Sequence, residues 1–156
     1  MKRTISFLLV LACAAPAPAA KSVEPTAPAS VTLSDQSGSL VKVTVEIADD
    51  NAERQQGLMH RTQLEEMAGM LFLFPNEAHQ TFWMKDTPLP LDMIFIRSDM
   101  TVLGIVENAE PMTTTSRSVP GTSQYVLEVN AGWAQRHNVA AGSRLRFDDV
   151  NLKAIK

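Results

Sequence analysis

Five charged side chains that could bind a ligand or transfer a proton are interleaved with strongly apolar segments of the chain. They are Arg54, Arg61, Lys85, Asp92 and Glu128. Arginine pairs with a carboxylate through two parallel hydrogen bonds, and a pair of carboxyl groups can serve as general acid and base. These residue types therefore indicate either a polar ligand pocket or a hydrolytic site.

Glu128 is the most informative of these residues because it lies inside a predicted strand. It is on the face opposite Tyr125 and Leu127 in a segment of period two. A buried carboxylate needs a partner, which Arg54 or Arg61 would supply. The sequence leaves two interpretations open: a clamp that holds a helical insertion on the sheet, and a polar pocket that recognises a small ligand.

A hydrolase that uses Asp92 and Glu128 is an alternative. Glycosidases place two carboxyl groups about 5 to 9.5 Å apart across the bond that is cleaved. The sequence does not give this separation, nor does it say which of the two carboxylates pairs with Arg61. Because no Ser-His-Asp or Cys-His pattern is recognisable, no catalytic residue is assigned and a binding protein is favoured over an enzyme.

Trp83 precedes Lys85 and a proline-rich loop, where its ring could stack on a ligand at the mouth of a pocket. Trp133 could do the same, although both indoles also suit a core because tryptophan is highly buried on average. The predicted ligand-binding residues are Arg54, Arg61, Trp83, Lys85, Asp92 and Glu128.

Methionines suggest a third kind of site, since thioethers and imidazoles bind Cu(I). The candidates are Met59, Met67, Met70, Met84, Met93, Met100 and Met112, with His60 and His79 near some of them. Methionine also fills irregular cores. Periplasmic copper binding is therefore kept as an alternative, and no metal or other cofactor is predicted.

The first twenty residues have the order of a secretion signal. Lys2 and Arg3 precede an apolar run and then a segment of small residues, and the run is too short for a membrane-spanning helix. Val10-Leu11-Ala12-Cys13 resembles a lipoprotein signal, so Cys13 is a candidate for lipidation. Residues 21–30 form a predicted flexible tether. We expect an exported protein, periplasmic or secreted, whose contact with a membrane would be a lipid anchor on Cys13.

Composition limits the remaining possibilities. The chain has 156 residues, and no cysteine follows Cys13, which excludes disulfides and thiolate zinc sites from the rest of the chain. The net charge is −3 and would be −5 after loss of Lys2 and Arg3 with the signal. Without a run of basic residues, no nucleic-acid partner is expected. A small ligand or a protein of the cell envelope is the predicted partner.

Residues 31–156 are predicted to form a single β-rich domain. Alternating apolar residues predict a strand over 41–47, paired with 31–33 through a turn at 35–38. Capping boxes predict short helices after Asp50 and after Thr62, and Asn130 is expected to cap a third. The expected fold is mainly β, a small barrel or sandwich with two or three short helical insertions.

Several separate blocks of sequence resemble domain-of-unknown-function family 192, which occurs in bacteria and archaea. The blocks are RQQGLMHR from Arg54, GMLFLF from Gly69, FWMK from Phe82, TPLPLD from Thr87, and VLE from Val126 followed by Gly132. The resemblance spans Val41 to Phe147. It implies a compact, mostly β domain, often behind a signal peptide, with no established activity. The matching positions are Arg54, Gly57, Met59, Arg61, Met70, Trp83, Met84, Pro90, Asp92 and Glu128.

Overall fold

The computed structural model describes residues 27–156, so the predicted signal and most of the predicted tether lie outside the described residues. Seven strands and two short α-helices follow one another, with a 3-10 turn at Leu152–Ala154. They are β1 (Ser30–Ser34), β2 (Leu40–Ala48), α1 (Asn51–Gln56), β3 (Ala68–Ala78), β4 (Leu91–Ile96), β5 (Val102–Ala109), β6 (Ser123–Asn130), α2 (Trp133–Arg136) and β7 (Leu145–Asp148). The predicted mainly β class is confirmed.

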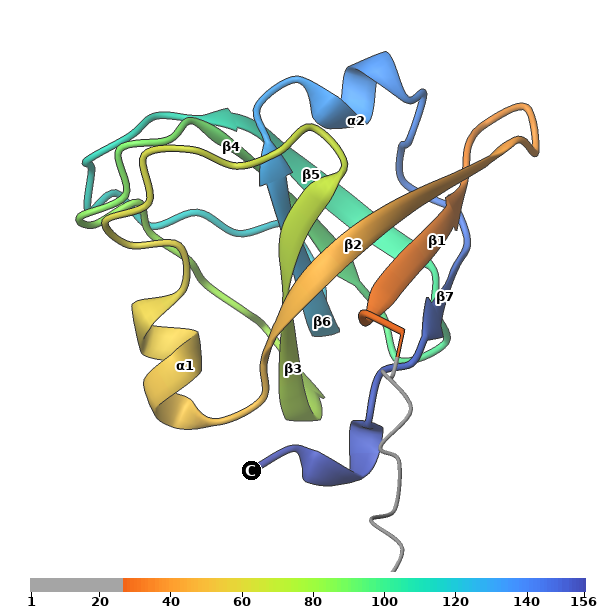
Figure 1. The fold of residues 1–156 in the computed structure, drawn as a ribbon, viewed down its shortest axis with the longest axis horizontal. Coiled ribbons are helices and arrows are strands. Elements are labelled where there is room, and N and C mark those ends of the chain that lie inside the picture. Colours follow the sequence, from red (N-terminus) through yellow and green to blue (C-terminus); the bar gives the residue numbers. More distant parts are fainter. Residues whose placement is uncertain (1–26) are drawn as a thin grey trace, which may run out of the picture.

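All seven strands belong to one sheet in the order β5-β4-β6-β3-β2-β1-β7. The β2–β3 pair is parallel and the other pairs are antiparallel. The sheet curls until its two ends approach each other (Figure 1). There the Val102 N–H donates to the Ser143 carbonyl at 2.9 Å and the Leu145 N–H to the Met100 carbonyl at 3.0 Å. The architecture is therefore a curled half-barrel.

Each face of the sheet carries its own apolar cluster, because side chains alternate along a strand. Leu127 and Val129 of β6 point to the inner cluster, together with Trp133 from α2. Val126 points to the outer cluster, which also contains Phe72. Glu128 alternates with Leu127 and Val129, so its side chain lies on the outer face.

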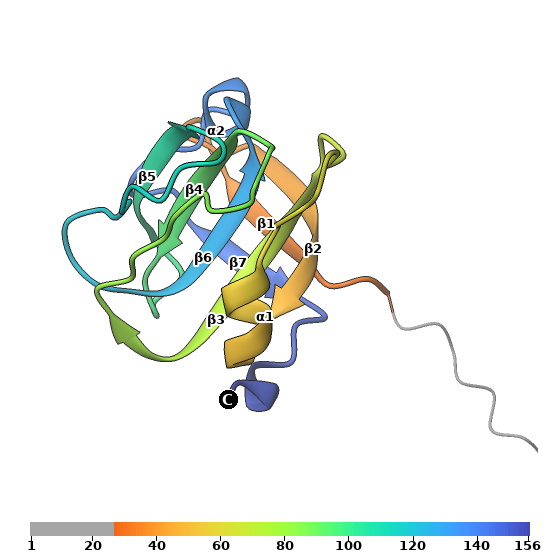
Figure 2. The same ribbon diagram turned by 90° about the vertical axis from the view of Figure 1, so that its left-hand side faces the viewer.

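The helix α1 and the long loops cover this outer face. Figure 2 shows α1 in front of the sheet at β2 and β3, beside the loops that enter β4 and β6. The predicted cap of α1 is confirmed, since Asp50 Oδ1 accepts from the Glu53 N–H at 2.9 Å and Gly57 follows the helix with a φ of 47°. In the described part of the chain, no helix is long and apolar enough to cross a membrane.

The prediction of a helix after Thr62 is wrong. Residues 61–65 have no regular secondary structure, and Gly69 belongs to β3 instead of ending a helix. Tertiary hydrogen bonds replace the helical ones, because the Asn130 amide donates to the carbonyls of Leu64 and Glu65 at 3.0 and 3.2 Å. The prediction that Asn130 caps α2 is therefore wrong.

Two predicted strands differ in extent. The continuous apolar run from Met70 to Phe74 predicts a strand that Pro75 ends, but β3 continues to Ala78. Its pairing with β6 is interrupted between Leu73 and Ala78, an irregularity that accommodates a proline without an N–H. The sequence Thr81-Phe82-Trp83-Met84 also predicts a strand, but the structure has only one bridge there, between Phe82 and Arg117.

Candidate ligand-binding site

A cavity of about 200 Å³ opens on the outer face between α1, β3 and the loop that precedes β4. Aromatic rings and the backbone after α1 form its walls, and Glu128 contributes from β6. The lining residues are Arg54, Gln55, Gln56, Gly57, Leu58, Met59, Phe72, Phe74, Thr81, Phe82, Trp83, Thr87 and Glu128. Of the six predicted ligand-binding residues, Arg54, Trp83 and Glu128 line it.

Glu128 is 4% exposed, and its two cross-strand neighbours are Met70 on β3 and Met93 on β4. Directly opposed residues share a face of the sheet, so the carboxyl group lies between two apolar side chains. Burial raises its pKa to about 8 because no opposite charge compensates the lost hydration. The arginine partner expected for Glu128 is not found within residues 27–156, where the four ion pairs involve other carboxylates.

Arg54 is fixed on the cavity wall by contacts with backbone and aromatic groups. Its guanidinium donates to the Leu73 carbonyl at 2.8 Å and to Asn51 Oδ1 at 2.7 Å. It also donates to the backbone oxygen of Lys156 and lies 5.4 Å from the centroid of the Phe74 ring. These contacts tie α1 to β3 and to Lys156, so Arg54 connects the helix to the sheet without an Asp or Glu side chain.

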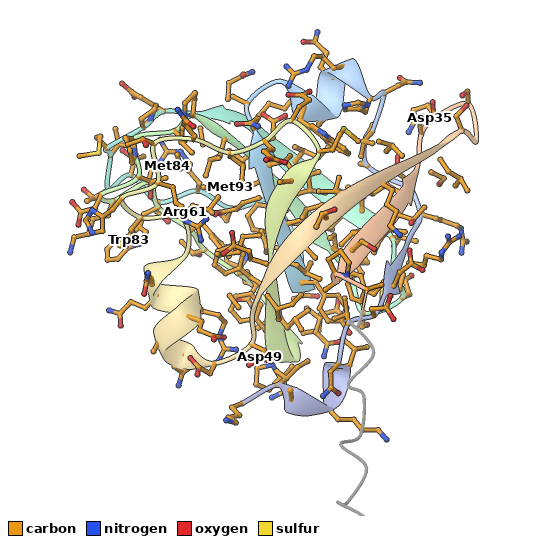
Figure 3. All side chains as sticks on the ribbon, viewed as in Figure 1. Asp35, Asp49, Arg61, Trp83, Met84 and Met93 are labelled. Carbon is orange, nitrogen blue, oxygen red and sulfur yellow. The ribbon has the colours of Figure 1, made fainter. Side chains whose placement is uncertain are left out.

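Trp83 lies at the outer edge of the loops near α1 (Figure 3), and it is 46% exposed. The ammonium of Lys85 lies 5.7 Å from the centroid of the indole ring, a distance typical of a cation–π contact. Lys85 therefore reaches the cavity only through Trp83. Met84, which lies between Trp83 and Lys85 in the sequence, is fully buried.

Arg61 does not line the cavity. It forms a two-point ion pair with Glu46 on β2, in which Nη1 lies 2.8 Å from Oε1. This hydrogen-bonded pair raises the pKa of the Arg61 guanidinium. Both side chains are about half exposed. The pair ties the connection between α1 and β3 to the preceding strand.

Asp92 is fully buried and serves the backbone around α2. Its Oδ1 accepts from the N–H groups of Asn108 and Gly132 at 2.9 and 3.0 Å, and Oδ2 accepts from Ala134 at 3.0 Å. Gly132 is the N-cap residue and has no side chain to cap the helix. The carboxylate of Asp92, and not the side chain of Asn130, therefore caps α2.

The methionines proposed as copper ligands are divided between core and surface. Met70, Met84 and Met93 are buried in the outer cluster, whereas Met67 and Met112 are exposed. No group of three or more His, Cys, Asp or Glu side chains within residues 27–156 is arranged to hold a metal ion. The placement of the three buried methionines matches a packing role among Phe and Leu.

Sequence reasoning missed the aromatic wall of the cavity. Phe82 packs edge-on against Phe72, Phe74 and Phe95, with centroid distances of 5.0, 6.3 and 5.9 Å. Its position next to Trp83 could have indicated this wall. Neighbouring residues in an extended segment point to opposite sides, so an exposed Trp83 predicts a Phe82 that points inward.

The fold and the cavity define a small β half-barrel domain with one buried carboxyl group in an outer pocket. The family model of DUF192, described as Uncharacterized ACR, matches residues 32–147, and the chain belongs to this family. The resemblance inferred from the sequence blocks is thereby confirmed.

Two solved structures are similar to this chain. One is a Sinorhizobium meliloti 1021 protein that has been proposed to be a transcription regulator, with 42% identity, a TM-score of 0.74, and coverage of 80% of this chain and 97% of that one. The other is a protein of unknown function from Novosphingobium aromaticivorans DSM 12444, with 36% identity, a TM-score of 0.73, and coverage of 83% and 94%. A search of curated proteins found no match.

Proposed function

We propose that the domain binds a small ligand in the outer cavity, with Glu128 as the group that recognises it. The observation that carries the proposal is a carboxyl group 4% exposed that lines a cavity without a charged partner among residues 27–156. Burying such a group destabilises a fold, so a protein that needed only packing would be served better by an apolar residue.

The protonation state of Glu128 sets the kind of contact it makes. With a pKa of about 8, the carboxyl group is mostly protonated at neutral pH and donates a hydrogen bond. Phe72, Phe74 and Phe82 provide apolar contact around it. A ligand that offers an acceptor oxygen to Glu128 and an apolar surface to the rings fits this arrangement, as in most small-molecule sites.

The size of the cavity restricts the ligand. About 200 Å³ lies below the usual range of roughly 300 to 1,000 Å³ for small-molecule pockets. The cavity therefore suits a compact molecule or one unit of a longer ligand. Arg54 on the wall adds a positive charge, although its donors already bind the backbone oxygens of Leu73 and Lys156.

A thermal-shift screen of the purified protein against sugars, short peptides, nucleotides, organic acids and metal ions tests the proposal. A ligand that binds only the folded state should add about 2.7 kcal/mol of stability at 100 times its Kd. The shift should disappear in Glu128→Gln and persist in Glu66→Gln, a matched change outside the cavity. A shift that is equal in both variants would place binding elsewhere and refute the proposal.

We also propose that the protein is exported. The support is the order of charged, apolar and small residues over positions 1–20, which lie outside the described residues. The N-terminal strand β1 starts at Ser30, the last residue of the predicted tether. An exported domain of this kind would present its cavity outside the cytoplasm, where it meets envelope or environmental ligands.

Cell fractionation and the intact mass of the purified protein test the export proposal. A soluble periplasmic form cleaved within the segment of small residues, Pro16-Ala17-Pro18-Ala19-Ala20, indicates an ordinary signal. A membrane-bound form that gains the mass of a lipid and loses it in Cys13→Ser indicates a lipoprotein. A cytoplasmic form that retains residues 1–20 contradicts export.

A further inference from the structure

A second hollow of about 330 Å³ flanks the same segment as the Glu128 cavity. Thr114 and Ser116 line it from the loop before β6, and both hollows share Thr81, Phe82 and Trp83. The shared segment thus separates two concave surfaces. A ligand longer than the Glu128 cavity can occupy both only by crossing this segment.

Backbone hydrogen bonds hold the shared segment to the loop on one side. Phe82 and Arg117 exchange two hydrogen bonds, of 2.9 and 2.8 Å, and the Met84 N–H donates to the Thr113 carbonyl at 2.9 Å. The backbone groups of Phe82 and Met84 are therefore occupied on that side. A fixed ridge, instead of a free loop, lies between the two hollows.

The ridge presents an aromatic surface to solvent. Phe82 points inward against Phe72, so Thr81 and Trp83 point outward by the alternation of an extended segment. Trp83 is 46% exposed, although tryptophan is highly buried on average. Lys85 lies over the ring at 5.7 Å from the centroid and restrains it.

Three residues with hydroxyl groups line the second hollow together with Trp83. The side chains of Thr81, Thr114 and Ser116 take part in none of the side-chain hydrogen bonds found within residues 27–156, and all three residues are exposed. A hydroxyl both donates and accepts, so such groups suit a ligand that is itself rich in hydroxyls. The second hollow is lined by no charged side chain.

From this arrangement we propose that the ligand is a linear, neutral saccharide that crosses Trp83, with one sugar in the Glu128 cavity and further units in the hollow beside Thr114 and Ser116. The proposal rests on the proposed function of the Glu128 cavity. A sugar ring has an apolar face that packs on an indole and a rim of hydroxyls that bind Thr and Ser. An extended peptide could not pair with the edge formed by Phe82 and Met84, because the loop at Thr113 and Arg117 already occupies it.

Titration calorimetry of the full protein with linear glucose and N-acetylglucosamine oligomers of one to six units tests this inference. Affinity should rise about tenfold or more from one unit to three and then level off as both hollows fill. Trp133 is fully buried, so a change in indole emission on binding should come from Trp83 and be absent in Trp83→Ala.

Substitutions of two residues that line the second hollow test its role separately. The double variant Thr114→Val and Ser116→Ala should abolish the increase in affinity with oligomer length. Its affinity for a single sugar should be unchanged. Thr115→Val, on the same loop but outside the lining, is the matched control. Affinity independent of length, or binding of uncharged peptides instead of any oligomer, overturns the inference.

The two proposals fail in different ways. Single-sugar binding that depends on Glu128 but gains nothing from length leaves the cavity proposal intact and refutes the linear saccharide. Length-dependent binding that is unaffected by Glu128→Gln refutes the cavity as the recognition site. If no oligomer binds, the proposal of a saccharide ligand is refuted. The thermal-shift screen then tests separately whether the Glu128 cavity binds another small ligand.

Discussion

Asp92 and Glu128 lie on the adjacent strands β4 and β6, yet their carboxyl groups point to opposite faces of the sheet. Asp92 is paired with Val129 and Glu128 with Met93, so the two acids are one position out of register. Because a shift of one residue exchanges the faces, Asp92 reaches the backbone around α2 and Glu128 reaches the outer cavity. Two carboxyl groups separated by a sheet do not flank one bond, and the structure gives no support to a hydrolase built on them.

The first prediction concerns the pH dependence of stability. The pKa of Glu128 is about 8 in the folded protein and 4.5 in the unfolded chain, so the folded state holds more protons between these values. The contribution of Glu128 to the free energy of unfolding should therefore be most favourable below pH 4.5 and should fall as the pH rises to 8. At 1.36 kcal/mol per unit, the loss should reach about 3 kcal/mol by pH 7.

Urea unfolding of the parent and of Glu128→Gln between pH 4 and pH 9 measures this effect. The neutral amide does not titrate, so the difference in free energy of unfolding between the two proteins should shift in favour of the variant as pH rises. The same slope in both proteins would show that Glu128 is ionised and compensated in the folded state.

A second prediction follows from the three N–H groups that Asp92 binds. In Asp92→Asn one oxygen is replaced by an NH₂ group, which would face the Ala134 N–H across the present 3.0 Å contact. The buried donor is then left unsatisfied, and the variant should lose about 2 to 3 kcal/mol in urea unfolding. Asp86→Asn is the control, because Asp86 is at a φ of 51° that Asn also adopts. Equal losses in both variants would contradict the capping role.

These two acids also show what sequence could and could not predict. Period two placed Glu128 opposite Leu127 and thus on a separate face, which the structure confirms. The partner of each polar group was not predictable, because it depends on chain crossings between distant segments. Asn130 looked like a helix cap by its position but binds carbonyls of the segment before β3, and Asp92 reaches α2 from a strand 40 residues earlier.

The cavity itself illustrates the same limit. The residue types of Arg54, Trp83 and Glu128 predict a binding site, and the three side chains lie together on the lining of the cavity. Arg61 was selected by the same reasoning but pairs with Glu46, because the connection after α1 passes over β2. Local patterns such as the Asp50 cap were predictable since they involve residues three apart, whereas the assignment of each arginine to a partner required the fold.

The third prediction concerns the ion pair of Arg61 with Glu46. Side-chain exposures of 43% and 53% mean that water and salt screen the interaction. A double-mutant cycle of Arg61→Ala and Glu46→Ala should therefore give a coupling below about 1 kcal/mol, smaller still in 1 M salt. Ligand binding should be unaffected, since neither residue lines the cavity. A coupling of several kcal/mol would indicate a desolvated pair and revise this assignment.

The last prediction concerns Gly69, the residue that begins the GMLFLF block on β3. A Cβ at this position would lie 2.5 Å from the backbone carbonyl of Glu128, closer than real contacts allow, and 3.1 Å from the Val129 side chain. Gly69→Ala should thus push β3 away from β6 and lower stability by about 1 to 3 kcal/mol, the usual effect of overpacking. Gly104→Ala on β5 is the matched control, because its nearest neighbour is the Val119 side chain at 3.2 Å, which can move. Since the displaced carbonyl belongs to Glu128, Gly69→Ala should also weaken any ligand that Glu128 binds, whereas Gly104→Ala should not. A stable Gly69→Ala variant with unchanged binding would show that the two strands separate there without disturbing the cavity.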